Sequence, residues 1–251
     1  MYKNQSVSVV MSTYNEKDSI RQCIDGFFNT GYVDEVVIVD NNASAGTAEE
    51  VKKTKAKLIH EPKQGYGHGF QAALKNASGD IMVMCEPDGT FTPQDIERLL
   101  AYSNSVDIVL GSRTNSTLLF SGANMGFFLK YGNYFVAKLI ELLFIDRSPS
   151  ITDCGCTFRL LNRRAYETIQ PYFSEGGSAF GKELTLLALR ARLSFCEIPI
   201  HYGKRVGVSS VTGSFSKSFF LGLKMIYLAL FSFIIDKIKP MPHDTAKSKQ
   251  D

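Results

Sequence analysis

The sequence predicts an α/β protein with a mostly parallel central sheet and helices on both faces. Short apolar runs alternate with helical patterns along the first half of the chain, which is typical of βαβ units. In addition, three predicted strands end in a polar residue that begins a loop, namely Ser12, Asp40 and Glu86. Ligands of open α/β sheets bind beyond the carboxyl ends of the strands. A site is therefore expected at that edge.

The predicted elements follow one another in regular order. Strands are predicted at VSVVMS (7–12), EVVIVD (35–40), AKLIHE (56–61), DIMVMCE (80–86) and VDIVLG (106–111). Helices are predicted at about 17–28, 47–55, 69–77 and 93–102. A further α/β stretch covers 156–169, 181–193 and 195–202. Because the strands are nearly continuous apolar runs, the sheet is expected to be covered on both faces.

Composition places the chain among globular proteins. Its 251 residues and 44% apolar share are enough for one sizeable α/β domain. A net charge of +3 is too small and too evenly spread for a nucleic-acid binder. The N-terminus lacks a secretory signal, so this end is expected to stay in the cytosol. The odd number of cysteines, five, favours reduced thiols. Cys154 and Cys156 have no second pair, so they are expected to pack and not to bind zinc.

Two strongly apolar helices are predicted outside the regular alternation. The first, at about 122–144, has an unusually wide apolar face, typical either of a core helix or of a helix on a bilayer surface. The second, at 217–239, is interrupted by Lys224 and keeps only eleven uncharged residues in a row, 225–235. Spanning a bilayer takes about twenty. Flanking lysines favour an anionic leaflet, so the chain is expected to be peripheral or monotopic on the cytoplasmic face of a membrane.

These patterns divide the chain into three parts. Residues 1–216 are predicted to form the α/β domain, 217–239 a juxtamembrane helix, and 240–251 a disordered tail.

The most informative stretch is Glu86-Pro87-Asp88-Gly89, which follows a strand that should be buried. Two carboxylates two positions apart would repel a phosphate unless a divalent cation lay between them. Mg²⁺ and Mn²⁺ bind through one or two carboxylates together with substrate phosphates. We therefore predict that Glu86 and Asp88 are ligands of Mg²⁺ or Mn²⁺ in a metal–diphosphate complex. The alternative is a simple Asp-Gly turn.

Other strand ends suggest a nucleotide. Asp40 can accept hydrogen bonds from a base or ribose, or form an Asx-turn. Tyr14 can stack on a base or be partly buried, and Glu16 can open a helix. The glycines of KQGYGHGF (63–70) are spaced G-x-G-x-G after the third strand, unlike the dinucleotide motif G-x-G-x-x-G after the first. Backbone packing beside a nucleotide is favoured over a nicotinamide or flavin oxidoreductase.

Taken in order, these segments resemble the family 2 inverting glycosyltransferases, and within them the dolichyl- and polyprenyl-phosphate sugar transferases. The resemblance covers 7–210 and rests on STYNE, VDNNASAGT, KQGYGHGFQAALKNASGD, EPDGTF, VDIVLGSR, DCGCTFRLLNR, KELTLLAL and EIPIHYGKRVGVSS. It implies a glycosyltransferase-A fold, a nucleotide-sugar donor linked to GDP or UDP, and a divalent metal.

The resemblance also implies donor-binding residues. Asp88 matches the metal-binding Asp of the D-x-D motif, and Glu86 replaces its first Asp. Ser12 and Asn41 stand where the family usually has Pro and commonly has a second Asp. The residues matched or expected on the donor side are Thr13, Tyr14, Glu16, Asp40, Lys63 and Gly67.

On the acceptor side, Arg113 matches the Arg of the family's GSR tripeptide, and Lys130 lies roughly where a basic residue meets the lipid phosphate. Arg205 and Ser209 match R-x-G-x-S, while Ser210 replaces the Lys that usually follows. Converging cations suit both a phosphate nucleophile and a diphosphate leaving group. The alternative for Arg113 and Arg205 is a surface salt bridge.

Three functions remain open on the sequence alone. A polyprenyl phosphate is already ionised and needs no general base, whereas a saccharide or protein hydroxyl does; Glu183 is the candidate base. The catalytic candidates are thus Asp88, Arg113, Arg205 and Glu183. A silent nucleotide-sugar-binding module is disfavoured by intact Asp88, Asp40 and Arg113. A homo-oligomer or a membrane-protein partner stays open.

Overall fold

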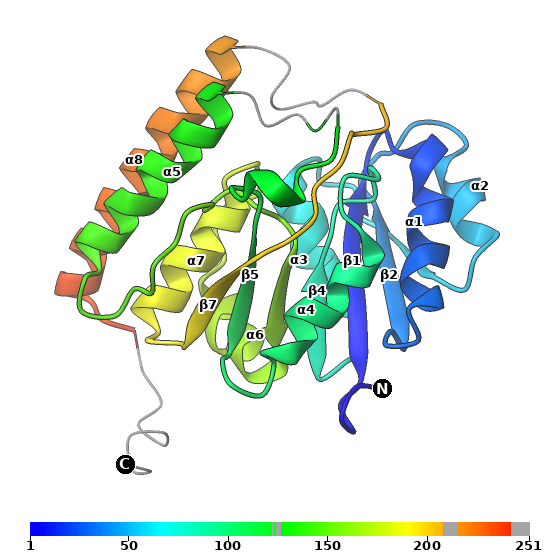
Figure 1. The fold of residues 1–251 in the computed structure, drawn as a ribbon, viewed down its shortest axis with the longest axis horizontal. Helices are drawn as coiled ribbons and strands as arrows, with labels where there is room; N and C mark the ends of the chain where they lie inside the picture. Colours follow the sequence, from blue (N-terminus) through cyan, green and yellow to red (C-terminus); the bar gives the residue numbers. More distant parts are fainter. Residues whose placement is uncertain (122, 124–126, 208–214, 242–251) are drawn as a thin grey trace.

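A seven-stranded sheet with the order β3-β2-β1-β4-β6-β5-β7 forms the centre of the protein (Figure 1). It is seen in a computed structural model that describes residues 1–121, 123, 127–207 and 215–241. The strands are β1 Val7–Thr13, β2 Glu35–Asp40, β3 Lys57–His60, β4 Ile81–Met84, β5 Ile108–Ser112, β6 Arg159–Asn162 and β7 Phe195–Pro199. β6 is antiparallel to its neighbours, and the other pairs are parallel.

The helices are α1 Lys17–Asn29, α2 Thr47–Lys52, α3 Tyr66–Asn76, α4 Ile96–Ala101, α5 Phe127–Leu143, α6 Arg163–Ile169, α7 Phe180–Arg190 and α8 Phe215–Ile238. Short 3₁₀ turns lie at Pro93–Asp95, Ser116–Leu118 and Gln170–Tyr172.

An apolar core lies on each face of the sheet. In β4, Met82 and Met84 belong to the core formed with α3, α6 and α7, whereas Ile81 and Val83 belong to the core formed with α1, α2 and α4. Successive residues of a strand point to opposite faces, so an unbroken apolar run supplies both cores. The predicted α/β class with helices on both faces is confirmed.

The antiparallel strand β6 was not predicted. It lies between β4 and β5, and its first residue, Arg159, pairs with Met84 near the carboxyl end of β4. Because β6 runs away from that edge, the segment just before it, 153–157, lies beside the predicted site. The sheet order depends on pairing between distant segments, which local apolar patterns do not encode.

The two long apolar helices α5 and α8 lie side by side along one edge of the molecule (Figure 1). One face of each helix is core: Val136, Ala137 and Ile140 of α5 and Met225 and Ala229 of α8 are buried. The core interpretation therefore holds for the inner faces. Among helices of the described residues, none has the length and apolarity needed to cross a bilayer. The predicted disordered tail, from 242 onward, lies outside the described residues.

Exposed apolar side chains remain on both helices, away from their buried residues. They are Tyr134, Phe135 and Leu142 on α5, and Leu223, Tyr227, Leu230, Phe231, Ile234 and Ile238 on α8. Below, this set is called the outer apolar face. Apolar patches on this scale mark interaction surfaces in soluble proteins.

The glycine-rich segment begins a helix earlier than predicted. α3 starts at Tyr66, not near residue 69, so Gly67 and Gly69 lie in its first turn. A Cβ atom on Gly67 would stand 2.2 Å from the carbonyl oxygen of Glu175, and one on Gly69 would stand 2.0 Å from Ser12 Oγ. The glycines thus allow close packing of the chain, as predicted.

We expect Gly67→Ala to lower the free energy of unfolding by about 1–3 kcal/mol, because the added methyl meets backbone that cannot move aside. The control is Gly132→Ala in α5, where a Cβ would meet nothing within 4 Å. That substitution should raise stability by about 0.4–1 kcal/mol. Urea midpoints with unchanged m-values give both numbers. Equal midpoints for the two variants would contradict the close packing at Gly67.

Candidate active site

The predicted strand ends meet at one edge of the sheet. β1 pairs with both β2 and β4, and Thr13 is in register with Asp40. Beyond β4, the side chain of Asp88 is fully buried; its Oδ1 accepts hydrogen bonds from Thr90 N (3.0 Å) and Thr90 Oγ1 (2.6 Å). Its Oδ2 is also buried but accepts no hydrogen bond from the described part of the chain. A buried oxygen without a well-directed hydrogen bond is uncommon and is stabilised by a nearby cation.

A guanidinium stands where that cation is needed. Arg205 Nη2 lies 2.6 Å from Asp88 Oδ2 and 2.8 Å from Glu86 Oε2. It is held there because Val206 N donates to Asp88 O and Gly203 N donates to Thr90 O, which aligns the two segments. Burial works against the charge, but the carboxylates of Asp88 and Glu86 outweigh it and raise the pKa of Arg205. Arg205 is therefore an ion-pair partner of the acidic rim.

Glu86 takes part in a second contact. Its Oε1 accepts a hydrogen bond of 2.7 Å from Thr157 Oγ1, which is itself 2.6 Å from Tyr66 OH. Burial, and then the neighbouring Asp88, raise the pKa of Glu86. Two ionised carboxylates this close repel each other unless one takes up a proton or a cation lies between them.

These features fit a divalent cation. Within the part of the chain that the structure describes, no three His, Cys, Asp or Glu side chains form a complete metal cage. Mg²⁺ and Mn²⁺ do not need one, since substrate phosphates and water complete their coordination. A buried carboxylate oxygen without a hydrogen bond, beside a second carboxylate and a stand-in guanidinium, has the chemistry of such a half-site.

Arg113 is held by a buried carboxylate. Its Nε and Nη2 donate to the two oxygens of Asp153 at 2.7 and 2.9 Å, and its guanidinium stacks 5.2 Å from the centre of the Tyr202 ring. Burial opposes the charge of Arg113, but Asp153 outweighs it and raises the pKa of Arg113, while Arg113 lowers that of Asp153. This pair is buried, so the alternative of a surface salt bridge is wrong for Arg113.

On the expected donor side, Glu16 organises its own loop. Its Oε2 accepts hydrogen bonds from Thr13 Oγ1 (3.0 Å), Tyr14 N (2.7 Å) and Asn15 N (2.9 Å). The Tyr14 ring is 44% exposed, which leaves a face for stacking. Asp40 Oδ1 accepts from Ala43 N at 2.7 Å, which is the Asx-type turn named as the alternative for this residue.

The side chain of Asn41 holds the loop that carries Lys63. Its Nδ2 donates to the carbonyl oxygens of Glu61 (2.9 Å) and Lys63 (2.8 Å), and its Oδ1 accepts from Gly65 N (2.8 Å). A carboxylate cannot donate to two carbonyls, so an Asp at this position could not hold the loop in the same way. The Lys63 side chain is exposed.

The carboxylate of Glu183 already accepts several hydrogen bonds. The side chain is buried, and its Oε1 accepts hydrogen bonds from Ser174 N (3.0 Å), Ser174 Oγ and Glu175 N (3.1 Å). It fixes the 174–176 loop, whose backbone carbonyls pack against Gly65 and Gly67. In this arrangement Glu183 supports the loop.

Two acceptor candidates remain, Lys130 and Ser209. Lys130 is half-buried and lies one turn before Asn133 on the inner side of α5. Ser209 lies outside the described residues.

Several residues of this edge were not predicted. Thr90, Asp153 and Thr157 each complete a contact of Asp88, Arg113 or Glu86. The only sequence signal was that 153–157 follows a helix and precedes a strand within a segment of the family resemblance. Partners separated by 40 and 71 residues cannot be paired from spacing.

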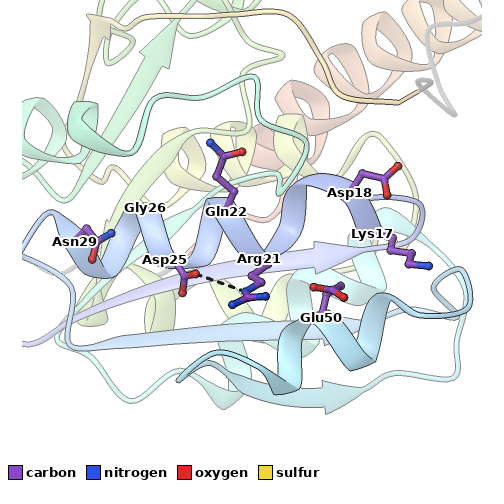
Figure 2. Close-up of a pocket in the computed structure, with 8 residues that line it drawn as sticks. All are labelled: Lys17, Asp18, Arg21, Gln22, Asp25, Gly26, Asn29 and Glu50. Carbon is purple, nitrogen blue, oxygen red and sulfur yellow. Dashed lines mark ion pairs between the residues drawn. The ribbon is translucent and has the colours of Figure 1, made fainter.

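One hollow lies apart from these residues, along α1 and α2 (Figure 2). Its volume is about 680 Å³, and its lining includes Lys17, Asp18, Arg21, Asp25 and Glu50, of both signs. Arg21 and Asp25, one turn apart on α1, form a loose, half-exposed ion pair of 3.9 Å in its lining. None of the predicted site residues lines this hollow.

An open α/β sheet with an acidic pair beyond a central strand is the arrangement expected of the glycosyltransferase-A class. The family model described as glycosyl transferase family 2 matches residues 8–170. The chain belongs to this family, and the resemblance found in the sequence is confirmed.

Curated relatives show moderate identity. The low-salt glycan biosynthesis hexosyltransferase Agl6 of Haloferax volcanii is 27% identical, over 82% of this chain and 50% of its own length. The dolichyl-phosphate beta-glucosyltransferase of Saccharomyces cerevisiae is 26% identical, over 78% and 66%. The dolichyl-phosphate hexose transferase of Haloferax volcanii is 27% identical, over 82% and 86%. The chain thus spans about half of the first relative and 66% of the second.

Solved structures share the fold at lower identity. Glucosyl-3-phosphoglycerate synthase from Mycobacterium tuberculosis, in complex with Mn²⁺, UDP and glucosyl-3-phosphoglycerate, aligns with a TM-score of 0.69 at 15% identity, over 92% of this chain and 80% of that one. The same enzyme with Mg²⁺ and UDP gives 0.69 at 14% identity, over 92% and 79%. This likeness confirms the expected glycosyltransferase-A fold.

Proposed function

We propose that this protein transfers a hexose from a GDP- or UDP-linked sugar to a polyprenyl or dolichyl phosphate, with inversion, at the cytoplasmic face of a membrane. One observation carries the proposal: the buried Asp88 Oδ2 accepts no hydrogen bond in the described chain and faces a cation beside Glu86. A nucleotide-sugar diphosphate bound with Mg²⁺ or Mn²⁺ supplies the charges that such a rim requires.

The donor half of the proposal has further support. Tyr14 offers an exposed ring, and Asp40 lies in register beside Thr13 at the same edge as Asp88. The solved structures with this fold include complexes of UDP with Mn²⁺ or Mg²⁺. When bound, the metal ion would neutralise negative charge on the departing nucleoside diphosphate. Glu86 and Asp88 are the residues that would hold it.

The acceptor half rests on the relatives and on Glu183. Two of the relatives are named as dolichyl-phosphate sugar transferases. A hydroxyl acceptor needs a general base, and the contacts of Glu183 with Ser174 and Glu175 favour a supporting role for it over that one. A phosphate oxygen needs no base: it attacks the anomeric carbon, the bond to the nucleoside diphosphate breaks, and both electrons of that bond leave with the diphosphate.

A direct assay tests the function. Purified protein is incubated with Mg²⁺ or Mn²⁺, a panel of GDP- and UDP-hexoses, and farnesyl phosphate, farnesol or an oligosaccharide as acceptor. We expect a glycosylated farnesyl phosphate by mass spectrometry, none with farnesol, and no product after chelation. Transfer to the oligosaccharide alone would instead support the alternative with Glu183 as general base.

The outer apolar face provides a route to the membrane. We propose that it lies on an anionic lipid surface, because it is apolar over two adjacent helices and Lys237 and Lys239 are exposed at the end of α8. Phe135→Glu combined with Phe231→Glu should weaken binding to phosphatidylglycerol-containing vesicles at least about tenfold, since burying each aromatic side chain contributes roughly 1.5–3 kcal/mol.

Vesicle sedimentation measures this effect. The matched control is Tyr102→Glu with Tyr172→Glu, two exposed aromatic residues outside α5 and α8; it should bind as wild type. Equal vesicle binding by both double variants would contradict the proposal that the outer apolar face lies on a lipid surface. A loss of self-association in the first variant, with vesicle binding intact, would assign the outer apolar face to a second copy of the chain.

A further inference from the structure

Two cations inside the protein lack a carboxylate partner. Arg159 is 1% exposed, and its guanidinium donates to the carbonyl oxygens of Cys156 and Gly181. Lys182 is 8% exposed; its backbone N–H donates to Ala179 O, but its side-chain ammonium makes no hydrogen bond or ion pair with any residue that the structure describes. Long charged side chains are almost never buried without a partner, so these two positive charges need an explanation.

The nearby carboxylate of Asp153 does not compensate these two positive charges. Lys182 and Arg159 both interact electrostatically with Asp153 and with each other. Asp153, however, is already bound through both of its oxygens to Arg113. The neighbouring Cys154 provides no negative charge either, because burial raises the pKa of its thiol to about 11 and keeps it protonated. The formal charges of Arg113, Asp153, Arg159 and Lys182 therefore sum to +2, and the nearby carboxylate of Glu197 is taken up by the backbone N–H groups of Thr152 and Asp153.

The location of Lys182 makes this excess less favourable still. It is the third residue of α7, and the positive end of the helix dipole disfavours a cation in the first turn. Burial lowers the pKa of Lys182, as expected for an ammonium without an anion. Lys182 nevertheless keeps 8% of its surface exposed to solvent. An incoming anion can reach it.

We propose that Lys182 binds the phosphate of the acceptor and selects an anionic acceptor over a neutral one. A phosphate monoester carries up to two negative charges near neutral pH and would compensate Lys182 and Arg159 together. Arg113 attracts an incoming phosphate less than the sequence suggested, since its charge is neutralised by Asp153. This assignment rests on the proposed function and adds Lys182 to the acceptor candidates Arg113, Lys130 and Arg205.

The surroundings of Lys182 favour the acceptor over the donor diphosphate. Lys182 interacts with Cys154, whose thiol donates to the carbonyl oxygen of Asn133 on α5. The same helix carries part of the outer apolar face, on which a lipid chain can lie. The donor candidates Thr13, Tyr14 and Asp40 lie instead at the ends of β1 and β2, and in the sheet order β4 lies between those strands and β6, which carries Arg159.

Binding of farnesyl phosphate to the full chain tests the assignment by calorimetry, in parallel with binding of UDP plus Mn²⁺. We expect Lys182→Met to weaken farnesyl phosphate binding by about tenfold to a hundredfold, the scale of a hydrogen bond to a charged group. Affinity for UDP plus Mn²⁺ should stay within about twofold of wild type. Lys75→Met, at an exposed helical lysine, is the control and should change neither.

Thermal unfolding separates ligand binding from a structural role. Replacing an unpaired buried charge by an apolar side chain of similar length is often neutral or stabilising, so Lys182→Met should melt at or above the wild-type temperature. It should also lose the stabilisation that farnesyl phosphate gives the wild type. If this variant does not fold, Lys182→Gln serves the same comparison.

The outcomes are distinct. Wild-type affinity of Lys182→Met for farnesyl phosphate would overturn the assignment while leaving the proposed function intact. A parallel loss of UDP affinity would also overturn it and would assign the charge to the donor diphosphate. If the wild type binds no farnesyl phosphate and transfers sugar only to an oligosaccharide, the proposed function and this assignment fail together.

Discussion

Asp88→Asn is expected to lower the rate of sugar transfer at least about a hundredfold, the scale observed when a key electrostatic stabiliser is removed. The substitution keeps the shape of the side chain, and its oxygen can still accept from Thr90 N and Thr90 Oγ1. What disappears is the negative charge at the buried Oδ2, which faces Arg205 and is the proposed metal contact. The loss should therefore appear in catalysis and in metal binding, with a normal melting temperature.

Initial rates and Mn²⁺-dependent binding of UDP are measured together. Asp25→Asn removes an exposed carboxylate of α1 and should leave both unchanged. Unaltered turnover in Asp88→Asn would exclude the metal assignment. A rate loss without any loss of Mn²⁺-dependent UDP binding would point to the ion pair with Arg205 as the function of Asp88.

Asp153→Ala is expected to lower the free energy of unfolding by about 3–5 kcal/mol, because removing one partner of a buried ion pair leaves the other charge uncompensated. Asp153 is fully buried, receives two hydrogen bonds from the guanidinium of Arg113, and also accepts from the backbone N–H groups of Arg113 and Gly155. Since whole domains are stable by only about 5–15 kcal/mol, this loss is a large fraction of the total.

Urea unfolding gives the value. Glu50→Ala, which breaks the exposed pair of Glu50 with Lys53, should cost less than about 1 kcal/mol. Replacing both partners, with Arg113→Met and Asp153→Leu, should recover at least about half of the loss because no buried charge remains. Equal costs for Asp153→Ala and Glu50→Ala would mean that the Arg113–Asp153 pair does not hold this edge together.

Local pattern was sufficient for most of the parallel part of the fold. The predicted starts of α1 and α2, at residues 17 and 47, agree with the structure, as does the strand end at Asp40, whereas β4 ends at Met84, two residues before the predicted end at Glu86. Alternation of apolar runs and helices is a property of neighbouring residues, so a single sequence can carry it. The start of α3 at Tyr66 was missed, because glycines ordinarily disfavour a helix. Here they are required by the backbone of residues 175 and 176.

By itself, the sequence determined the fold class, the edge of the sheet at which chemistry is expected, and the acidic pair Glu86 and Asp88, because these depend on residue type and short spacing. Only the tertiary structure decided which charges are free. It paired Arg113 with Asp153, set Arg205 between the two carboxylates, used Glu183 to hold a loop, and left Lys182 without an anion. The physical reason is that the effect of a charge depends on its burial and on partners that lie far away along the chain.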